Sequence, residues 1–183
     1  LGMVARDLTP NGVRAAGIRL LAHLDPDGTL TDDRDRQRRR GLMLMPQDRQ
    51  LLSKVRALLT PALRAELEVV LQSWAAPGMN NPDDPDSPTG AFEVADKAAV
   101  AAAAERDDRN ASQRNHDALH AMLRFIRANA GASTSTDSLK SELVVTITDH
   151  ELAQRAGVAL TATGTRLPVS ELVHVAAGAT PHL

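Results

Sequence analysis

Two histidines and an aspartate have the spacing found in zinc-binding helices. His116 and His120 are four residues apart and Asp117 follows the first, so one helical face would present both imidazoles. Asp is shorter than the Glu of the zinc motif and no third ligand follows at a useful distance. We therefore predict no metal and no cofactor in this chain. A metal-dependent hydrolase that uses the two histidines is the remaining catalytic alternative.

We favour a structural interpretation of this stretch, in which a polar network anchors the helix to the rest of the fold. Removing Asp117 should then leave buried partners unpaired and lower stability. Arg106 and Asp107 lie earlier, on a segment that is polar all round, and their substitution should matter little. The polar motif comprises Arg114, Asn115, His116 and Asp117.

A second candidate is a run of arginines that follows a group of aspartates. Guanidinium groups match phosphate geometry, so these side chains could contact a DNA backbone. The alternative is a solvent-exposed helix held by intrahelical ion pairs, Asp32 with Arg36 and Asp35 with Arg39. The run comprises Arg34, Arg36, Arg38, Arg39 and Arg40.

Residues 77–90 are rich in Pro and Asp, which excludes a helix or a central strand there. Asp83, Asp84 and Asp86 could hold a cation, although solvation of a loop is the simpler interpretation. We predict that this segment is an internal linker within a single domain of residues 1–183.

Composition excludes several classes of site. The 183 residues contain no cysteine, which removes disulfides, thiol catalysis and Cys-ligated zinc. A formal net charge of −2 and an aromatic content of 2% argue against a globally basic nucleic-acid binder and against base-stacking platforms. Without a signal peptide or an apolar run near 18 residues, we expect a cytoplasmic protein that does not contact membranes.

The sequence predicts several helices along the chain, and these helices must position the candidate residues. Thr-Pro pairs at 9–10 and 60–61 mark helix starts, and apolar periodicity carries these helices to residues 24 and 74. A turn at 25–28 separates the first helix from the arginine run. No Pro or Gly occurs from 91 to 130, so one helix could run over about 96–129. At roughly 50 Å it would either bridge two parts of the fold or bend in its middle. Its buried stripe would comprise Leu119, Met122, Leu123 and Ile126.

Short strands complete the prediction. Residues 42–46 and 51–58 permit a β-hairpin, although the second run could equally begin a helix. Residues 142–148 and 157–163 have strand composition. Thr148 and Glu151 have the spacing of a capping box, and Pro168 opens a last helix. We predict an α+β fold, mostly helical, with a long central helix and about four short strands.

Four stretches stand in order along the chain: LLAHLDPDG at 20–28, APGMNNPDD at 76–84, QRNHDAL at 113–119 and GTRLPVS at 164–170. Together they resemble the 13E12 repeat family of actinobacteria, also called domain of unknown function 222. The resemblance spans most of the chain. It implies a family-specific N-terminal region that family members continue into a C-terminal HNH endonuclease module rich in Cys and His.

That module is absent from this sequence. An HNH site needs a His to activate water, further metal ligands and usually a Cys-bound zinc. The chain has no cysteine and no His-Asn-His spacing after residue 150. The resemblance thus implies a truncated, DNA-associated and non-catalytic region of an HNH-endonuclease-like protein. The alternative is a structural or self-association domain, a homo-oligomer without nucleic-acid contact.

Overall fold

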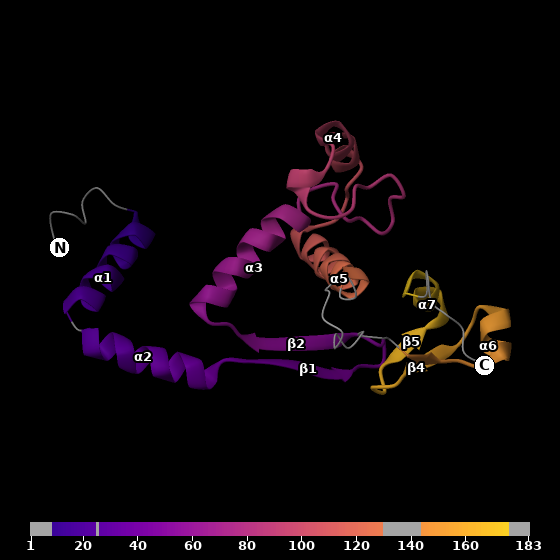
Figure 1. Cartoon of the computed structure of the whole chain (residues 1–183), viewed down its shortest axis with the longest axis horizontal. Helices are drawn as coiled ribbons and strands as arrows, with labels where there is room; N and C mark the ends of the chain where they lie inside the picture. The colour runs from indigo at the N-terminus through magenta and orange to yellow at the C-terminus, as the bar shows by residue number, and fades with distance from the viewer. Residues whose placement is uncertain (1–8, 25, 130–143, 176–183) are drawn as a thin grey trace. The chain divides into compact units, whose positions relative to one another are not determined.

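The computed structural model describes residues 9–24, 26–129 and 144–175 (Figure 1). Within these ranges the chain forms seven α-helices, one 3-10 helix and five short strands in two small sheets. The prediction of a mostly helical α+β fold is confirmed. The chain divides into two units, residues 1–44 with 55–63 and residues 45–54 with 64–183, which we describe separately.

The first unit is built on two consecutive helices, α1 (Pro10–Leu24) and α2 (Pro26–Arg39). The hydroxyl of Thr9 accepts a hydrogen bond from the Gly12 amide at 3.3 Å, which confirms the predicted cap. The predicted turn at 25–28 is wrong, because α2 already begins at Pro26. Proline suits the first helical position, where its missing N–H leaves no bond unmade. No described side chain of this unit is buried.

A β-hairpin of β1 (Gly41–Gln47) and β2 (Ser53–Leu58) follows, as predicted, and the division between the units falls within it. Asp48 closes its turn, since its carboxylate accepts from the amides of Gln50 at 2.8 Å and Leu52 at 3.0 Å. Beside the turn, the side-chain amide of Gln47 donates to the backbone carbonyl of Arg166 at 2.8 Å and accepts from the backbone N–H of Arg166 at 2.7 Å. It thus pairs with both backbone groups of Arg166, as a residue of a neighbouring strand would.

Helix α3 (Pro61–Trp74) confirms the second Thr-Pro start, since the Thr60 hydroxyl accepts from the Leu63 amide at 3.3 Å. A short 3-10 helix, η2 (Phe92–Val94), precedes the next α-helix. Near the end of α3 the Trp74 ring meets Phe125 edge-to-face, with ring centroids 5.7 Å apart.

The predicted helix over 96–129 is wrong. The structure has two helices, α4 (Lys97–Glu105) and α5 (Ala111–Asn129), with a break at 106–110. Asn110 and Gln113 form a reciprocal cap that starts α5. The backbone N–H of Gln113 donates to the side-chain oxygen of Asn110 at 3.0 Å, and the backbone N–H of Asn110 donates to the side-chain oxygen of Gln113 at 2.9 Å.

The buried stripe predicted for α5 is also wrong. Leu119, Leu123 and Ile126 are 49, 52 and 60% exposed, whereas Ala118 is fully buried. Their helical spacing is real, but no packing partner covers them within the described residues. The buried apolar side chains between residues 77 and 129 are small or flexible, which allows the backbones to approach closely. They are Met79, Val100, Ala103 and Ala118.

A three-stranded antiparallel sheet ends the described chain. Its order is β3 (Val145–Thr146), β4 (Val158–Thr161), β5 (Arg166–Pro168), with Ala159 opposite Leu167. The predicted strand at 142–148 is thus two residues long within the described part, and 142–143 lie outside it.

Two short helices complete this sheet region. The capping box of Thr148 and Glu151 is confirmed at the start of α6 (Asp149–Gln154). Helix α7 (Val169–Val175) contacts β4 and β5, and Pro168 ends β5 directly before it. The buried side chains are Ala159, Thr161, Val169 and Leu172. In the described part of the chain, no helix is both long and apolar enough to cross a bilayer.

Candidate functional site

A buried arginine joins the loop after α3 to α5. Arg109 lies in the 106–110 break and its side chain is 10% exposed. Its Nε donates to Asp107 Oδ1 at 2.9 Å, and its Nη2 donates to Asp107 Oδ2 and the Met79 carbonyl at 3.1 and 2.8 Å. Its Nη1 donates to the Asn80 carbonyl at 3.1 Å and to Asp117 Oδ2 at 2.7 Å. All five guanidinium N–H groups are therefore used inside the fold.

This hydrogen-bonding pattern gives Arg109 a structural role. A guanidinium with no remaining donor cannot also bind a phosphate or a carboxylate from a ligand. Its charge is tolerated in a buried position because two carboxylates and two carbonyls surround it. We call the group of Arg109, Asp107, Asp117 and the carbonyls of residues 79 and 80 the arginine network.

Asp107 is the most deeply buried member of the arginine network, with a fully buried side chain. Its Oδ2 also accepts from the Gly78 amide at 2.8 Å, and its Oδ1 accepts from the Arg109 amide at 3.1 Å. The hydrogen bond from the Arg109 side chain is the main reason that the pKa of Asp107 falls from 3.8 to about 2. This burial contradicts the prediction that Asp107 lies on a segment that is polar all round.

Asn80 closes the loop that the arginine network holds. Its backbone is left-handed, with φ of 50°, and its side chain is almost fully buried. The side-chain amide donates to the carbonyls of Trp74 and Gly90 at 2.8 and 2.9 Å and accepts from the Gly90 amide at 2.8 Å. Residues 77–90, expected to be a linker, form a loop that is closed by its own side chains.

The predicted polar motif contributes two of its four residues to this arrangement. Asp117 joins the arginine network, and Arg114 Nη1 donates to the Arg109 carbonyl at 2.5 Å. Asn115 is exposed, and His116 is 79% exposed while its Nδ1 lies 2.9 Å from Asp117 Oδ1. The sequence predicted an anchor to the rest of the fold, and the structure places the contacts of Arg109 and its partners at the loop at 78–80.

Sequence reasoning missed Arg109, Asp107 and Asn80. The run Asp107-Asp108-Arg109-Asn110 offered a signal, because Asp and Asn compete with a helix for backbone hydrogen bonds and favour caps and turns. It did not reveal which carbonyls the arginine would reach, because these lie about 30 residues away in sequence.

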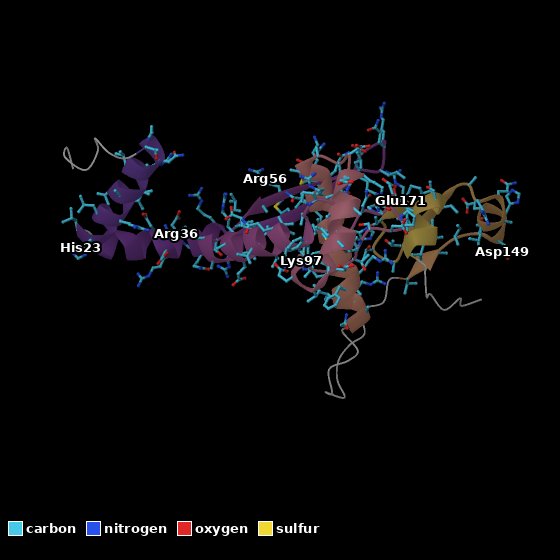
Figure 2. The ribbon with its side chains drawn as sticks, turned by 90° about the horizontal axis from the view of Figure 1, so that it is seen from above. His23, Arg36, Arg56, Lys97, Asp149 and Glu171 are labelled. Atoms are coloured by element: carbon cyan, nitrogen blue, oxygen red, sulfur yellow. The ribbon has the colours of Figure 1, made fainter. Side chains whose placement is uncertain are left out.

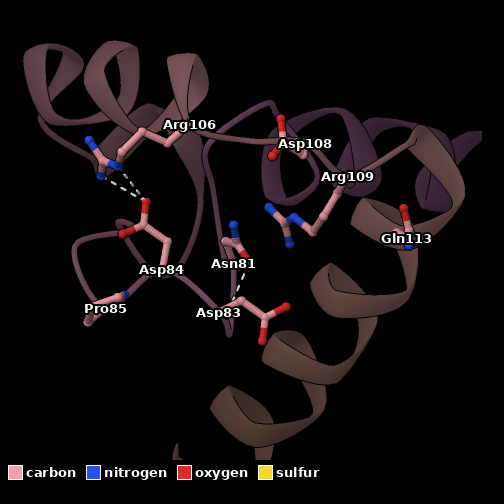
Figure 3. Close-up of a pocket in the computed structure, with 8 residues that line it drawn as sticks. All are labelled: Asn81, Asp83, Asp84, Pro85, Arg106, Asp108, Arg109 and Gln113. Atoms are coloured by element: carbon pink, nitrogen blue, oxygen red, sulfur yellow. Dashed lines mark hydrogen bonds and ion pairs between the residues drawn. The ribbon is translucent and has the colours of Figure 1, made fainter.

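Two open clefts that share part of their lining flank the arginine network, and Figure 3 shows the larger one. The larger, of about 470 Å³, contains the Arg106–Asp84 ion pair at 2.8 Å. Asp83 and Asp108 also line it, and neither has an ion pair within the described residues. The smaller, of about 370 Å³, includes Pro82, Asp83, Arg109, Asn110, Ser112, Gln113, His116 and Asp117. An acidic, open lining with a fully used arginine does not favour an anionic ligand.

Within the described residues, the histidine pair does not have enough metal-binding neighbours to form a site. Among the residues that the structure describes, no three His, Asp or Glu side chains gather closely enough to hold a metal ion. His116 shares its aspartate with Arg109, so that carboxylate is already engaged by a full positive charge.

Comparison with known proteins identifies the family. The family model described as "Domain of unknown function (DUF222)" matches residues 3–183. The chain belongs to the DUF222 family. It is 38% identical over all 183 residues to the uncharacterized protein Rv1128c of Mycobacterium tuberculosis, covering 39% of that protein. It is 37% identical to the uncharacterized protein Mb1179c of Mycobacterium bovis, covering 38% of it.

No solved structure gives a significant match to this DUF222 chain. The chain spans about two fifths of the length of these mycobacterial relatives. Two of the four stretches that carry the family resemblance, 76–84 and 113–119, meet at Arg109 in the structure. The arginine network is thus the point at which separate family segments are held together.

The arginine run of this DUF222 chain occupies the C-terminal half of α2, with Arg40 directly after the helix, and Figure 2 labels Arg36 of this run. Asp35 pairs with Arg39 at 3.2 Å, as predicted, and with Arg38 at 3.6 Å. The predicted pair of Asp32 with Arg36 is wrong, because Arg36 pairs with Asp33, three residues away. Positions i+3 and i+4 both neighbour residue i on a helix, so either spacing can form.

Proposed function

We propose that this DUF222 chain is a DNA-associated, non-catalytic region of a longer HNH-endonuclease-like protein of the 13E12 repeat type. Helix α2 and the residue that follows it contact DNA phosphates through Arg34, Arg36, Arg38, Arg39 and Arg40. One observation carries the proposal. The arginine side chains of this run lie at the surface, with exposed fractions of 42% for Arg36, 76% for Arg38 and 69% for Arg39.

The charge balance supports α2 as the contact. Five arginines against three aspartates give residues 31–40 a net charge of +2, although the whole chain carries −2. The intrahelical ion pairs are exposed, and exposed pairs contribute only about 0–1 kcal/mol each. Phosphate oxygens can therefore replace the aspartates as partners of these guanidinium groups at little cost.

The rest of the site offers no competing phosphate contact. The arginine network has no donor left, and the clefts beside it expose carboxylates. The mycobacterial relatives extend well beyond the region that this chain matches, which is compatible with a separate catalytic segment in proteins of this type.

Duplex binding followed by fluorescence anisotropy over a range of salt concentrations tests the proposal. We expect affinity to fall steeply with salt, because each phosphate that an arginine neutralises releases counterions. Changing Arg38, Arg39 and Arg40 together to Ser should weaken binding. It should also reduce the slope of log K against log salt by about 0.9 for each phosphate that is no longer neutralised, or about 3 in all.

A control variant with the same loss of charge separates direct phosphate binding from general electrostatics. Arg64, Arg124 and Arg127 are exposed residues of α3 and α5, and changing all three to Ser should leave the salt slope nearly unchanged. Equal losses of affinity in the two triple variants would show that α2 does not bind the DNA. An absence of binding at low salt would contradict the proposal itself.

The non-catalytic part of the proposal has its own test. We expect no nicking of supercoiled plasmid by the purified chain with Mg²⁺, Mn²⁺ or Zn²⁺, because no HNH ligand set is present in its sequence. Metal-dependent nicking that disappears in His116→Ala would contradict this. It would instead support the histidine-based alternative.

A further inference from the structure

Strand β5 lies at the edge of the sheet β3-β4-β5 and turns few backbone groups outward. Along an antiparallel pair of strands, hydrogen-bonded and non-hydrogen-bonded residue pairs alternate. Thr161 donates its N–H to the Thr165 carbonyl at 2.9 Å, so the next pair, Leu160 opposite Arg166, is a non-hydrogen-bonded pair. The N–H and C=O of Arg166 therefore point away from β4. Pro168, the next outward residue, has no N–H, so Arg166 provides the one outward donor of β5.

The side chain of Gln47 occupies the place of a neighbouring strand at Arg166. Its Oε1 accepts from the Arg166 N–H at 2.7 Å, and its Nε2 donates to the Arg166 carbonyl at 2.8 Å. The backbone of an added strand would offer the same acceptor and the same donor. The second hydrogen of Nε2 goes to the Leu51 carbonyl at 3.0 Å, so both N–H groups and the oxygen of the carboxamide are used.

The contact between Gln47 and Arg166 can open without unfolding either side. The turn that carries Gln47 is closed by bonds of its own, among them the Asp48 N–H to the Leu52 carbonyl at 2.9 Å. Arg166 belongs to a strand that is paired with β4. The two Gln47–Arg166 bonds are exposed, so water competes for the same groups and their net contribution to stability is small. Residues 45–54 and β5 belong to the same unit of the chain.

We propose that Gln47 is a reversible latch, which docks the hairpin turn at 45–54 onto β5 and keeps the outward edge of that strand closed. With the latch closed, the one outward N–H of β5 has a partner within the chain. With the latch open, the N–H and C=O of Arg166 are free to pair with another extended segment, as at any unprotected sheet edge. The proposal does not depend on DNA binding, because it uses backbone groups of the second unit and not the arginine run.

Amide hydrogen exchange of single residues in the full chain, followed by NMR, tests the latch. In the wild type we expect the Arg166 N–H to be protected although it faces the outer edge of the sheet. Gln47→Ala should lower the protection of Arg166 by about tenfold or more, because the variant removes the acceptor of this N–H. The amides of Asp48 and Leu167 should keep their wild-type protection, because the turn and the pairing of β4 with β5 remain intact.

Two further variants separate the hydrogen bonds of the latch from simple shielding by a side chain. Gln47→Met keeps the length of the side chain but removes the carboxamide, so Arg166 should lose protection as it does in Gln47→Ala. Gln50→Ala, at an exposed position of the same turn, is the matched control and should behave like the wild type.

An Arg166 N–H that exchanges freely in the wild type would overturn the proposal. Unchanged protection of Arg166 in Gln47→Ala or Gln47→Met would do the same. Loss of protection at Leu167 as well would also overturn it, because Gln47 would then support the sheet as a whole and would not act as a latch on its edge.

Discussion

At the scale of single residues, Arg109 does what no other described side chain of this protein does. It binds two carboxylates and two backbone carbonyls from three segments of the chain. A planar guanidinium with five fixed donors is suited to this arrangement, whereas an ammonium group offers three donors from one point. The arginine network therefore depends on the shape of the cation as well as on its charge.

Arg109→Lys should lower the free energy of unfolding by about 2–5 kcal/mol, because at least two buried acceptors lose their donors. Urea unfolding followed by circular dichroism measures the change. Arg106→Lys is the control, since Arg106 is 46% exposed and bonded to Asp84, and it should cost less than about 1 kcal/mol. Equal effects of the two variants would show that the arginine network contributes little.

Asp107 makes the stability of the fold depend on pH. Its pKa is about 2 in the folded state and 3.8 without the fold, so the unfolded chain binds the proton more tightly. The contribution of this carboxylate, about 2 kcal/mol, is complete above about pH 4 and is lost as pH falls towards 2. Asp107→Asn should lose this contribution at neutral pH and show a flatter decline of stability below pH 4.

Urea unfolding at several pH values measures the Asp107 effect. Asp83→Asn, at an exposed position of the loop at 77–90, serves as the control and should retain the wild-type pH profile. If Asp107→Asn retained the wild-type decline between pH 4 and 2, another carboxylate would be responsible for it.

At the scale of elements, the loop at 77–90 and helix α4 are in direct backbone contact. Gly78 has φ of 81°, and a Cβ placed there would lie 2.8 Å from the Val100 carbonyl oxygen. Backbone atoms of a helix cannot move aside as a side chain can. The close contact explains why Ala103 is buried on α4 beneath the loop.

Gly78→Ala should therefore be more damaging than an ordinary glycine substitution. The left-handed backbone alone costs about 1 kcal/mol for a residue with a Cβ, and the clash with α4 adds to this cost. Gly90→Ala separates the two effects, because Gly90 also has a positive φ, of 103°, with nothing within 4 Å of the added Cβ. Thermal melts of the two variants should show a clearly lower Tm for Gly78→Ala, and equal Tm values would exclude the clash.

At the scale of the whole molecule, the two units differ in how much they bury. All buried apolar side chains of the described residues belong to the second unit, from Met79 to Leu172. Helix α1 of the first unit presents apolar side chains such as Ile18 and Leu21 that are 60 and 66% exposed. Local opening is easiest where few apolar contacts are broken.

Hydrogen exchange should therefore be faster in α1 and α2 than in α4, whose Val100 and Ala103 are buried. Mass spectrometry of peptides from 10–24, 26–39 and 97–105 measures the difference. Equal protection of the three helices would show that the apolar side chains of the first unit are covered in solution.

The sequence by itself determined the elements whose signals are local. The caps at Thr9, Thr60 and Thr148, the hairpin and the mostly helical α+β class all follow from contacts between residues a few positions apart. Family membership could also be recognised from short stretches, because it requires only residue identities and their order.

Only the tertiary structure decided where the central helix breaks and which polar groups are buried. Propensity favoured one helix over 96–129, but Asp107 and Arg109 gain hydrogen bonds with Gly78, Met79 and Asn80 that a continuous helix would not offer them. Apolar spacing likewise predicted a buried face on α5 without showing what would cover it. Burial and long-range hydrogen bonding depend on partners distant in the chain, and local sequence patterns do not encode those partners.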